Sequence, residues 1–128
     1  MQFTYSKQEK LKKRKLLKTL FKEGKATTVF PLRMVYLKHE HSGNFPVQAS
    51  VSVSKRNFKR AVDRNRIKRL LREAYRLNKY ILYDNLEDNY IMMFIYLAKE
   101  EEPFQVIEKN MQELMQKFLK KIDRNDKK

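Results

Sequence analysis

The two histidines and the clustered carboxylates are the residue types that could support hydrolysis by this chain alone. His39 and His41 stand in a polar segment, His39–Pro46, and their H-x-H spacing could ligate a metal ion, but no third ligand is near in sequence. The carboxylates outside the predicted helices fall in turns, where we interpret them as solvating charges: Asp84, Glu87, Asp88 and Glu100–Glu102. We therefore predict no catalytic residue in this chain, and we interpret both histidines as exposed loop residues.

The basic residues are concentrated in two blocks rather than spread along the chain. There are 30 Lys+Arg against 15 Asp+Glu, a net charge of +15, which points to a polyanionic partner such as nucleic acid. Residues 1–25 carry net +7 and residues 54–80 net +9, whereas residues 26–53 carry +1 and residues 81–128 carry −2. An anionic membrane surface is the weaker alternative. The block at 54–80 therefore predicts a binding face.

Length and composition indicate one domain. The 128 residues are 41% hydrophobic, which suffices for one small core, and we expect a single domain over residues 1–128 with a frayed polar tail from about residue 123. The chain has no cysteine, no secretory signal and no apolar run near ~20 residues. We therefore expect a cytoplasmic protein without a membrane span, and no obligate protein partner is evident.

Hydrophobic periodicity predicts the elements of the first half of the chain. Ser6 and Glu9 have the spacing of a capping box, and leucines at helical spacing predict a helix that ends near Glu23. Phe30–Leu37 is predicted to be a strand. From Val47 to Ser54, apolar residues alternate with serine and glutamine, which predicts a half-buried strand whose second face can lie against something polar.

The second half predicts two amphipathic helices around one buried strand. Ala61–Ile81 and Phe104–Ile122 have helical periodicity, and Tyr90–Ala98 is a continuous apolar run. The polar face of the first of these helices carries Asn65, Lys68, Arg69, Arg72, Arg76 and Lys79. The order is helix, strand, strand, helix, strand, helix, with room for a further strand within residues 30–53. We predict an α+β sandwich, with one small, mostly antiparallel sheet and a β-α-β crossover.

The basic helix and the turn before it carry a specific motif. Residues 53–73 read VSKRNFKRAVDRNRIKRLLRE, which resembles the signature of the bacterial ribonuclease P protein subunit: V-[SA]-K-K, a short linker with A-V or A-H, then R-N-R-I-K-R-x-x-R-E. The likeness extends to Lys10-Leu11, to Leu20–Gly24, to Val35-Tyr36, to the apolar strand after the basic helix and to the closing helix. It therefore covers nearly the whole chain.

The resemblance implies a fold and an activity. The family fold is an α-β sandwich with a left-handed β-α-β crossover, against the usual handedness rule. The family activity is removal of the 5′ leader from precursor tRNA by a ribonucleoprotein whose RNA subunit performs the hydrolysis with Mg²⁺. The expected partners are therefore the ribonuclease P RNA subunit and precursor tRNA, with Mg²⁺ mainly on the RNA. The protein alone is predicted to be inactive.

The resemblance also implies roles for single residues. The residues expected to bind the catalytic RNA are Lys55, Arg56, Lys59, Arg60, Arg64, Asn65, Arg66, Lys68, Arg69 and Arg72. A cleft between the sheet and the first helix is expected to hold the leader through Leu17, Phe21 and Tyr36. Many family members have Phe at the position of Leu17, which removes one stacking surface. Core packing is the alternative role for Phe21 and Tyr36, and helix capping is the alternative for Asn65.

Two other functions remain open from the sequence. A structural RNA-binding protein, for example a ribosomal one, could share the same sandwich, and a stand-alone nuclease could use His39 and His41. The R-N-R motif favours the ribonuclease P subunit over the structural protein. A cleavage assay with the protein alone distinguishes the subunit from the nuclease.

Overall fold

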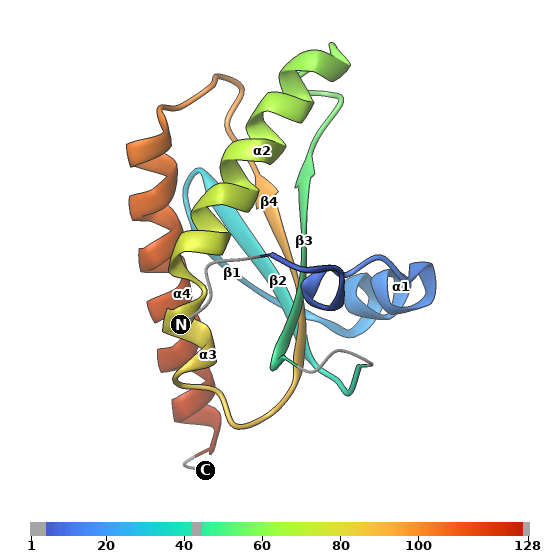
Figure 1. Cartoon of the computed structure of the whole chain (residues 1–128), viewed down its shortest axis with the longest axis vertical. Coiled ribbons are helices and arrows are strands. Elements are labelled where there is room, and N and C mark those ends of the chain that lie inside the picture. The colour runs from blue at the N-terminus through green and yellow to red at the C-terminus, as the bar shows by residue number, and fades with distance from the viewer. Residues whose placement is uncertain (1–4, 42–44, 127–128) are drawn as a thin grey trace.

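A four-stranded mixed sheet lies at the centre of the structure, a computed structural model that describes residues 5–41 and 45–126, with side chains as far as residue 123 (Figure 1). The elements in chain order are η1 (Lys7–Glu9), α1 (Arg14–Glu23), β1 (Lys25–Val29), β2 (Leu32–Lys38), β3 (Val47–Val53), α2 (Ala61–Asn78), α3 (Tyr80–Tyr83), β4 (Tyr90–Tyr96) and α4 (Phe104–Asp126). The predicted α+β sandwich is confirmed.

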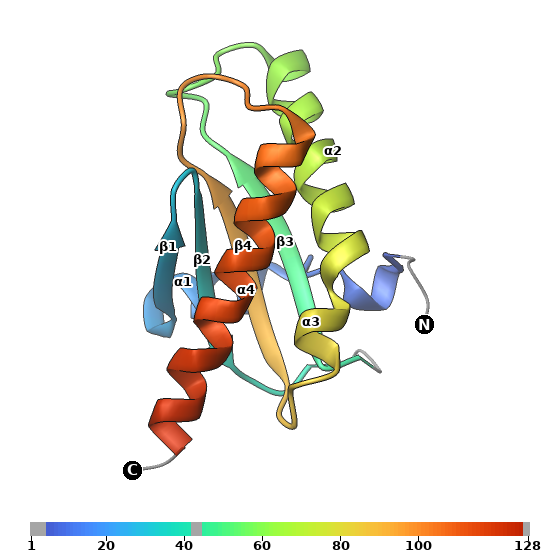
Figure 2. The same ribbon diagram turned by 90° about the vertical axis from the view of Figure 1, so that its left-hand side faces the viewer.

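The strand order is β1-β2-β4-β3, and two of its three pairings are antiparallel. The neighbours β3 and β4 are parallel and are connected through α2 and α3. In Figure 2 both strands run upward, α2 lies on the viewer's side of the sheet, and the chain moves leftward from β3 to β4. This is the left-handed crossover that the family resemblance implies, and it is the rare hand for such units.

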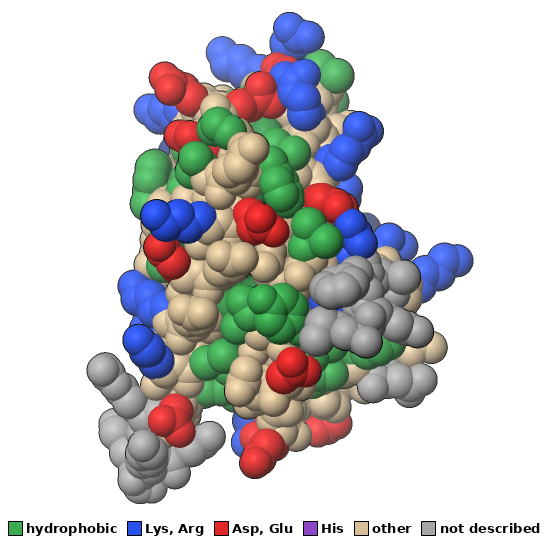
Figure 3. Space-filling model, turned by 60° about the vertical axis from the view of Figure 1, so that its left-hand side comes forward, with side chains coloured by type: hydrophobic (Ala, Val, Ile, Leu, Met, Phe, Trp, Pro, Cys, Tyr) green, Lys and Arg blue, Asp and Glu red, His purple; other side chains and the backbone are tan. Residues whose placement is uncertain are grey.

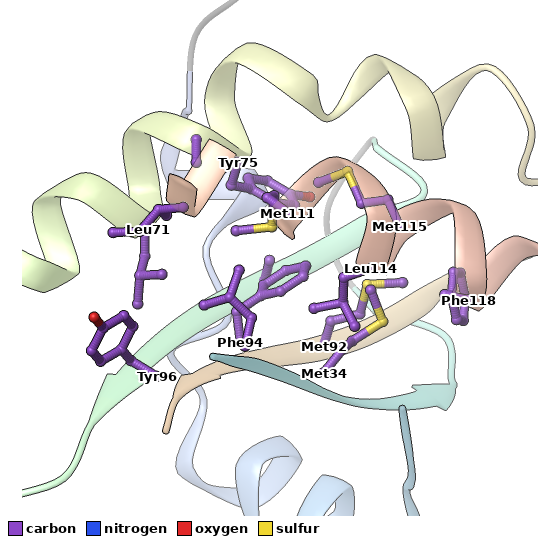
Figure 4. Packing of buried hydrophobic residues seen from close by; sticks show 14 of the residues in the cluster. Met34, Leu71, Tyr75, Met92, Phe94, Tyr96, Met111, Leu114, Met115 and Phe118 are labelled. Carbon is purple, nitrogen blue, oxygen red and sulfur yellow. The ribbon is translucent and has the colours of Figure 1, made fainter. Parts of the chain in front are cut away.

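The main core lies between the sheet and the helices α2 and α4. Every second residue of the strands points to this side, and Figure 4 shows Met34, Met92 and Phe94 of the sheet facing Leu71 of α2 and Leu114 of α4. All five side chains are fully buried. Because this core fixes α2 on one side only, the opposite side of the helix stays in contact with solvent.

A smaller core lies on the other face of the sheet, under α1. Leu20 of α1 packs there with Val35 and Met93 of the strands. Gly24, which follows α1, lets the helix end lie close to β2, because a Cβ at this position would approach the Leu20 carbonyl oxygen to 2.4 Å and the Tyr36 carbonyl oxygen to 3.0 Å. The predicted helix end near Glu23 is confirmed.

Several details differ from the sequence-based expectation. The additional strand is β1, and it precedes residue 30 rather than lying within residues 30–53. The capping box of Ser6 and Glu9 belongs to η1, of which Ser6 is the N-cap, and η1 is separate from α1. The closing helix continues to Asp126, into the segment expected to be frayed, while residues 127 and 128 lie outside the described residues. Among the described helices, none combines the length and the apolar character needed to span a membrane.

Candidate nucleic-acid interface

The turn between β3 and α2 is held by hydrogen bonds from its own polar groups. The backbone N–H of Phe58 donates to the carbonyl of Ser54 at 3.1 Å, and the backbone N–H of Arg56 donates to the Ser54 hydroxyl at 3.0 Å. The amide of Asn57 donates to the carbonyl of Leu97 at 3.2 Å, which ties the turn to the end of β4. The turn is thus anchored through its serine and asparagine, and its cations remain exposed: Lys55, Arg56, Lys59 and Arg60.

Arg64 has a role inside the protein. Its Nη1 donates to the carbonyls of Phe58 and Lys59 at 2.8 and 2.9 Å, and the side chain is half-buried. No side-chain cap is present at the N-terminus of α2, and the Arg64 side chain connects the first turn of the helix to the preceding segment. If Arg64 contacts RNA as predicted, it does so with a guanidinium that already donates to two carbonyls of the protein.

The solvent-facing side of α2 forms a ridge, which we define as Asn65, Arg69 and Arg72. All three side chains are exposed, and Lys68 on the flank is half-buried. Within the described part of the chain, neither Arg69 nor Arg72 has an ion-pair partner. Figure 3 shows Lys and Arg side chains gathered along the upper right-hand margin, over α2, whereas the face over α4 carries both signs of charge.

Arg66, the second arginine of the R-N-R motif, is held by two carboxylates. Its Nε and Nη2 donate to the two oxygens of Glu101 at 2.6 and 3.0 Å, and Nη2 also donates to Asp63 at 2.8 Å. Asp63 in turn lies 3.7 Å from Nε of Arg60. The bidentate pair with Glu101 raises the pKa of Arg66 above its ordinary value. The guanidinium therefore connects α2 to the turn before α4.

Lys79 does not belong to the exposed basic face. The sequence places it on the polar side of one long helix, but α2 ends at Asn78 and α3 starts at Tyr80. Lys79 stands at this junction and is 4% exposed, in an ion pair with Glu9. The prediction that Lys79 lies on the exposed polar face is wrong, because other parts of the chain cover this end of the helix: Glu9 pairs with the ammonium, and the rings of Phe45 and Tyr83 lie beside it.

The face of the sheet toward α1 contains a row of side chains that no helix covers. The register aligns Thr28, Arg33, Ile95 and Ser52 across all four strands. Thr28 and Arg33 are exposed, and Ile95 and Ser52 are half-buried. Figure 1 shows α1 crossing only the lower part of this face. We call these four residues the open row. Only Ser52 was indicated by the sequence, through the small polar face of its strand.

The three residues expected in a leader cleft do not lie together. Leu17 is half-buried against the smaller core, and Phe21 on the same helix is 57% exposed, so core packing does not explain Phe21. Tyr36 is 6% exposed and points to the opposite face of the sheet, where its ring meets Phe118 edge-on at 4.7 Å. Its neighbour Val35 faces α1, and strand alternation sends Tyr36 the other way.

Burial raises the pKa of the Tyr36 hydroxyl, as expected for a core position. The residue borders a cavity of about 220 Å³ on the α4 side together with Lys25 and Tyr90. Tyr36 as a member of an α1-side cleft is therefore corrected to a core residue.

The histidine loop offers little for metal chemistry. The ring of His39 is hydrogen-bonded to the carbonyl of Glu40 at 2.6 Å, and the His41 ring lies 3.4 Å from the carbonyl of Pro46. Over residues 5–41 and 45–126, no three His, Asp or Glu side chains gather in a way that could hold a metal ion.

These observations define a class of protein: a small basic α+β sandwich with an arginine ridge on one helix and a partly open sheet face. The chain belongs to the ribonuclease P protein family, whose model, described as Ribonuclease P, matches residues 5–119. A relative from Porphyromonas gingivalis named ribonuclease P protein component is 46% identical over 114 residues, which cover 86% of this chain and 82% of the relative.

Solved structures agree with the family at the level of the fold. The ribonuclease P protein of Thermotoga maritima superposes with a TM-score of 0.68 at 23% identity, covering 85% of this chain and 96% of that protein. The protein from Staphylococcus aureus gives a TM-score of 0.68 at 18% identity, with 84% and 93% covered. The family match and the relative at 46% identity show that the chain is a protein component of ribonuclease P, a tRNA-processing endoribonuclease, and a purely structural RNA-binding role is not favoured. Membership implies partnership with the ribonuclease P RNA.

Proposed function

We propose that the ridge on α2, together with the turn before it, is the surface that binds the ribonuclease P RNA. The single observation that carries this assignment is the pair of exposed arginines, Arg69 and Arg72, that have no ion-pair partner within the described residues. Arginine suits phosphate because its guanidinium donates two parallel hydrogen bonds. The exposed cations of the turn add charge at the N-terminus of α2, where helix N–H groups already favour anions.

The second RNA surface lies on the α1 side, and its ligand in this proposal is the unpaired 5′ leader of precursor tRNA. Phe21 offers an exposed ring on which a base can stack. In the open row, Arg33 supplies a cation for the backbone, while Thr28 and Ser52 supply hydroxyls and Ile95 an apolar contact. Leu17 adds contact area beside Phe21 but has no aromatic face. A single strand can use such a mixed surface, because its bases and phosphates are both accessible.

Hydrolysis is assigned to the RNA subunit with bound Mg²⁺. The described residues do not fit a Mg²⁺ site of their own, because no three carboxylates or histidines gather among them. In this proposal the protein binds and orients two RNAs, and no proton transfer or metal step is assigned to its side chains.

Reconstitution tests the proposed function. The protein with its cognate RNA subunit is expected to cleave a precursor tRNA at low Mg²⁺, and the protein alone is expected to leave it intact. The RNA subunit alone at high Mg²⁺ is the control for catalysis without protein. Mg²⁺-dependent cleavage by RNA-free protein that is lost in a His39→Ala, His41→Ala double variant would instead favour a stand-alone nuclease.

A further inference from the structure

A buried ion pair connects the start of the chain to the junction between α2 and α3. Glu9 is fully buried and Lys79 is 4% exposed, and the Lys79 ammonium donates to Oε2 of the Glu9 carboxylate. The hydroxyl of Tyr83 donates to the same oxygen at 2.6 Å. The other carboxylate oxygen accepts from the backbone N–H and the hydroxyl of Ser6 at 3.0 and 3.1 Å. Glu9 therefore accepts four hydrogen bonds.

Aromatic rings enclose the cation of this pair. The Lys79 ammonium lies 5.3 Å from the centre of the Tyr83 ring and 5.7 Å from that of Phe45, and the two rings stack at 5.9 Å. Burial alone would raise the pKa of Glu9, but the hydrogen bonds from Lys79, Tyr83 and Ser6 outweigh it and bring the pKa below its ordinary value. The Glu9 carboxyl therefore stays ionised at neutral pH.

The residues after Glu9 pass around the edge of the sheet to the opposite face. Lys10 forms a parallel bridge with Ala49 of β3, and the backbone N–H of Leu11 donates to the Ala49 carbonyl at 2.9 Å. Leu11 is then buried in the core under α1. Figure 2 shows the blue N-terminal turn at the β3 edge, beside α3 and the lower end of α2, with α1 behind the sheet, and the Glu9–Lys79 ion pair confirms that the turn contacts the junction between these helices. We call residues 5–13 the N-terminal segment.

The N-terminal segment thus links the two faces on which the proposed RNA surfaces lie. One end is anchored to the base of α2 through Glu9, and the other leads directly into α1, which carries Leu17 and Phe21. Two side-chain hydrogen bonds also join the segment to the β3 edge: the Gln48 side-chain amide donates to the Gln8 carbonyl at 3.1 Å, and the Tyr5 hydroxyl donates to the Ala49 carbonyl. The Tyr5 ring lies 5.4 Å from the Tyr75 ring of α2. Loss of the Glu9 anchor would leave α1 attached to the sheet but free to shift along it.

We propose that Glu9 and Lys79 are positioning residues for the leader surface: their buried pair sets where α1, and with it Phe21, lies against the sheet. The proposal rests on the proposed function of the α1 side. Buried ion pairs contribute little net stability compared with apolar residues of the same volume, but they demand one geometry, because a displaced partner leaves a buried charge without compensation. A pair that tolerates only one geometry is suited to fixing the position of α1.

The test measures leader binding separately from assembly. In the reconstituted holoenzyme, the affinity ratio between a long-leader and a leaderless precursor tRNA reports the leader surface. Glu9→Gln is expected to lower this ratio by about 2- to 30-fold, the usual range for coupling through a positioning contact. Affinity for the RNA subunit is expected to stay unchanged. Tyr83→Phe removes one hydrogen bond and keeps the ion pair, so it should fold even if Glu9→Gln does not, and shift the ratio less in the same direction.

A matched control and a second readout make the result decisive. Tyr96→Phe also removes the hydroxyl of a buried ring. This hydroxyl donates to the Glu100 carbonyl and accepts from the Glu102 backbone N–H, far from the N-terminal segment, so its loss should leave the ratio unchanged. Hydrogen exchange at the Leu11 amide should accelerate in Glu9→Gln and Tyr83→Phe while exchange in α2 stays slow. An unchanged ratio in a folded variant, or equal weakening of both precursors, would overturn the positioning role. A wild-type ratio near one would instead overturn the proposed leader surface itself, whatever the exchange data show.

Discussion

The ridge on α2 and the open row of the sheet present different chemistry to an RNA. The ridge consists of Asn65 and two arginines on one exposed helix side. The open row has one cation, Arg33, among hydroxyl and aliphatic side chains spread over four strands. A helix displays long charged side chains in parallel, so it attracts phosphates at a distance, whereas a sheet face makes short-range contacts with whatever lies on it. In the proposed function, one small domain therefore uses separate surfaces for affinity to the RNA subunit and for discrimination between precursors.

Salt should affect the two surfaces very differently, and this is the largest effect we expect. With about 6–10 phosphate contacts, affinity for the ribonuclease P RNA should fall by about 10³–10⁵ between roughly 50 and 200 mM monovalent salt, by analogy with duplex DNA. The affinity ratio of long-leader to leaderless precursor should change far less, because stacking and apolar contacts release few counterions. A filter-binding titration across salt measures both. If affinity for the ribonuclease P RNA did not change with salt, the ridge would not be the main contact with that RNA.

Truncation of Tyr36 should act on stability rather than on either RNA surface. Its ring is buried between the sheet and α4, in edge contact with Phe118. Tyr36→Ala should lower the free energy of unfolding by about 3–5 kcal/mol, the usual cost of deleting a buried aromatic ring. Urea denaturation of the free protein measures the loss. If the Tyr36→Ala protein were stable and bound only leader-carrying precursors more weakly, Tyr36 would have to be assigned to the leader surface.

Within α2, the cations without carboxylate partners should matter most for assembly. Arg69→Ala should weaken binding of the RNA subunit on the order of tenfold to a hundredfold, because it deletes a charge-assisted phosphate contact. Arg76 is the matched control on the same helix, since its guanidinium is already paired with Glu73. Arg76→Ala should cost less in the same binding assay. Equal losses would mean that net charge, rather than the ridge, determines affinity.

Phe21 should affect only precursors that carry a leader. Phe21→Ala in the assembled holoenzyme should reduce affinity for a long-leader precursor by about 1–3 kcal/mol, the value of one base stacked on an aromatic ring. Phe30 provides the control, because it is also an exposed phenylalanine, 68% accessible, but lies in the β1–β2 turn. Phe30→Ala should leave both precursor affinities unchanged. A loss with the leaderless precursor as well would place Phe21 at another contact.

The contrast between the two surfaces also explains what the sequence could predict. The ridge was predictable because helical periodicity and charge are both visible along one continuous segment. The open row was not, because it needs the register of four strands, and Arg33 lies far from Ser52 in sequence. Tyr36 was assigned to the leader cleft by the family resemblance alone, whereas strand alternation decides which face of the sheet it occupies: Val35 and Leu37 face α1, so Tyr36 faces α4.

The helix break after Asn78 also left no sign in the sequence. Lys79 continues the basic pattern of α2, and only the partner Glu9, 70 positions earlier, shows why its charge is buried. Long-range pairs of this kind leave no periodic signal in one sequence. Glu9 was noticed only for its local spacing from Ser6, which is confirmed, but its contact with Lys79 is the interaction that places the segment.

The smallest expected effect concerns Arg66, beside the ridge, because the carboxylates of Glu101 and Asp63 compete with RNA phosphates for its guanidinium. Glu101 and Asp63 occupy three N–H···O contacts of the Arg66 guanidinium, which leaves Nη1 for a phosphate. Glu101→Gln removes one anion from the border of the ridge and loosens Arg66, so RNA affinity should rise by about 1.5- to 5-fold, the scale of an exposed ion pair. Glu113→Gln, an exposed carboxylate on α4, is the control for the change in net charge. A loss of affinity in Glu101→Gln would show that Glu101 orients Arg66 toward the RNA, and the ridge would then extend to the turn before α4.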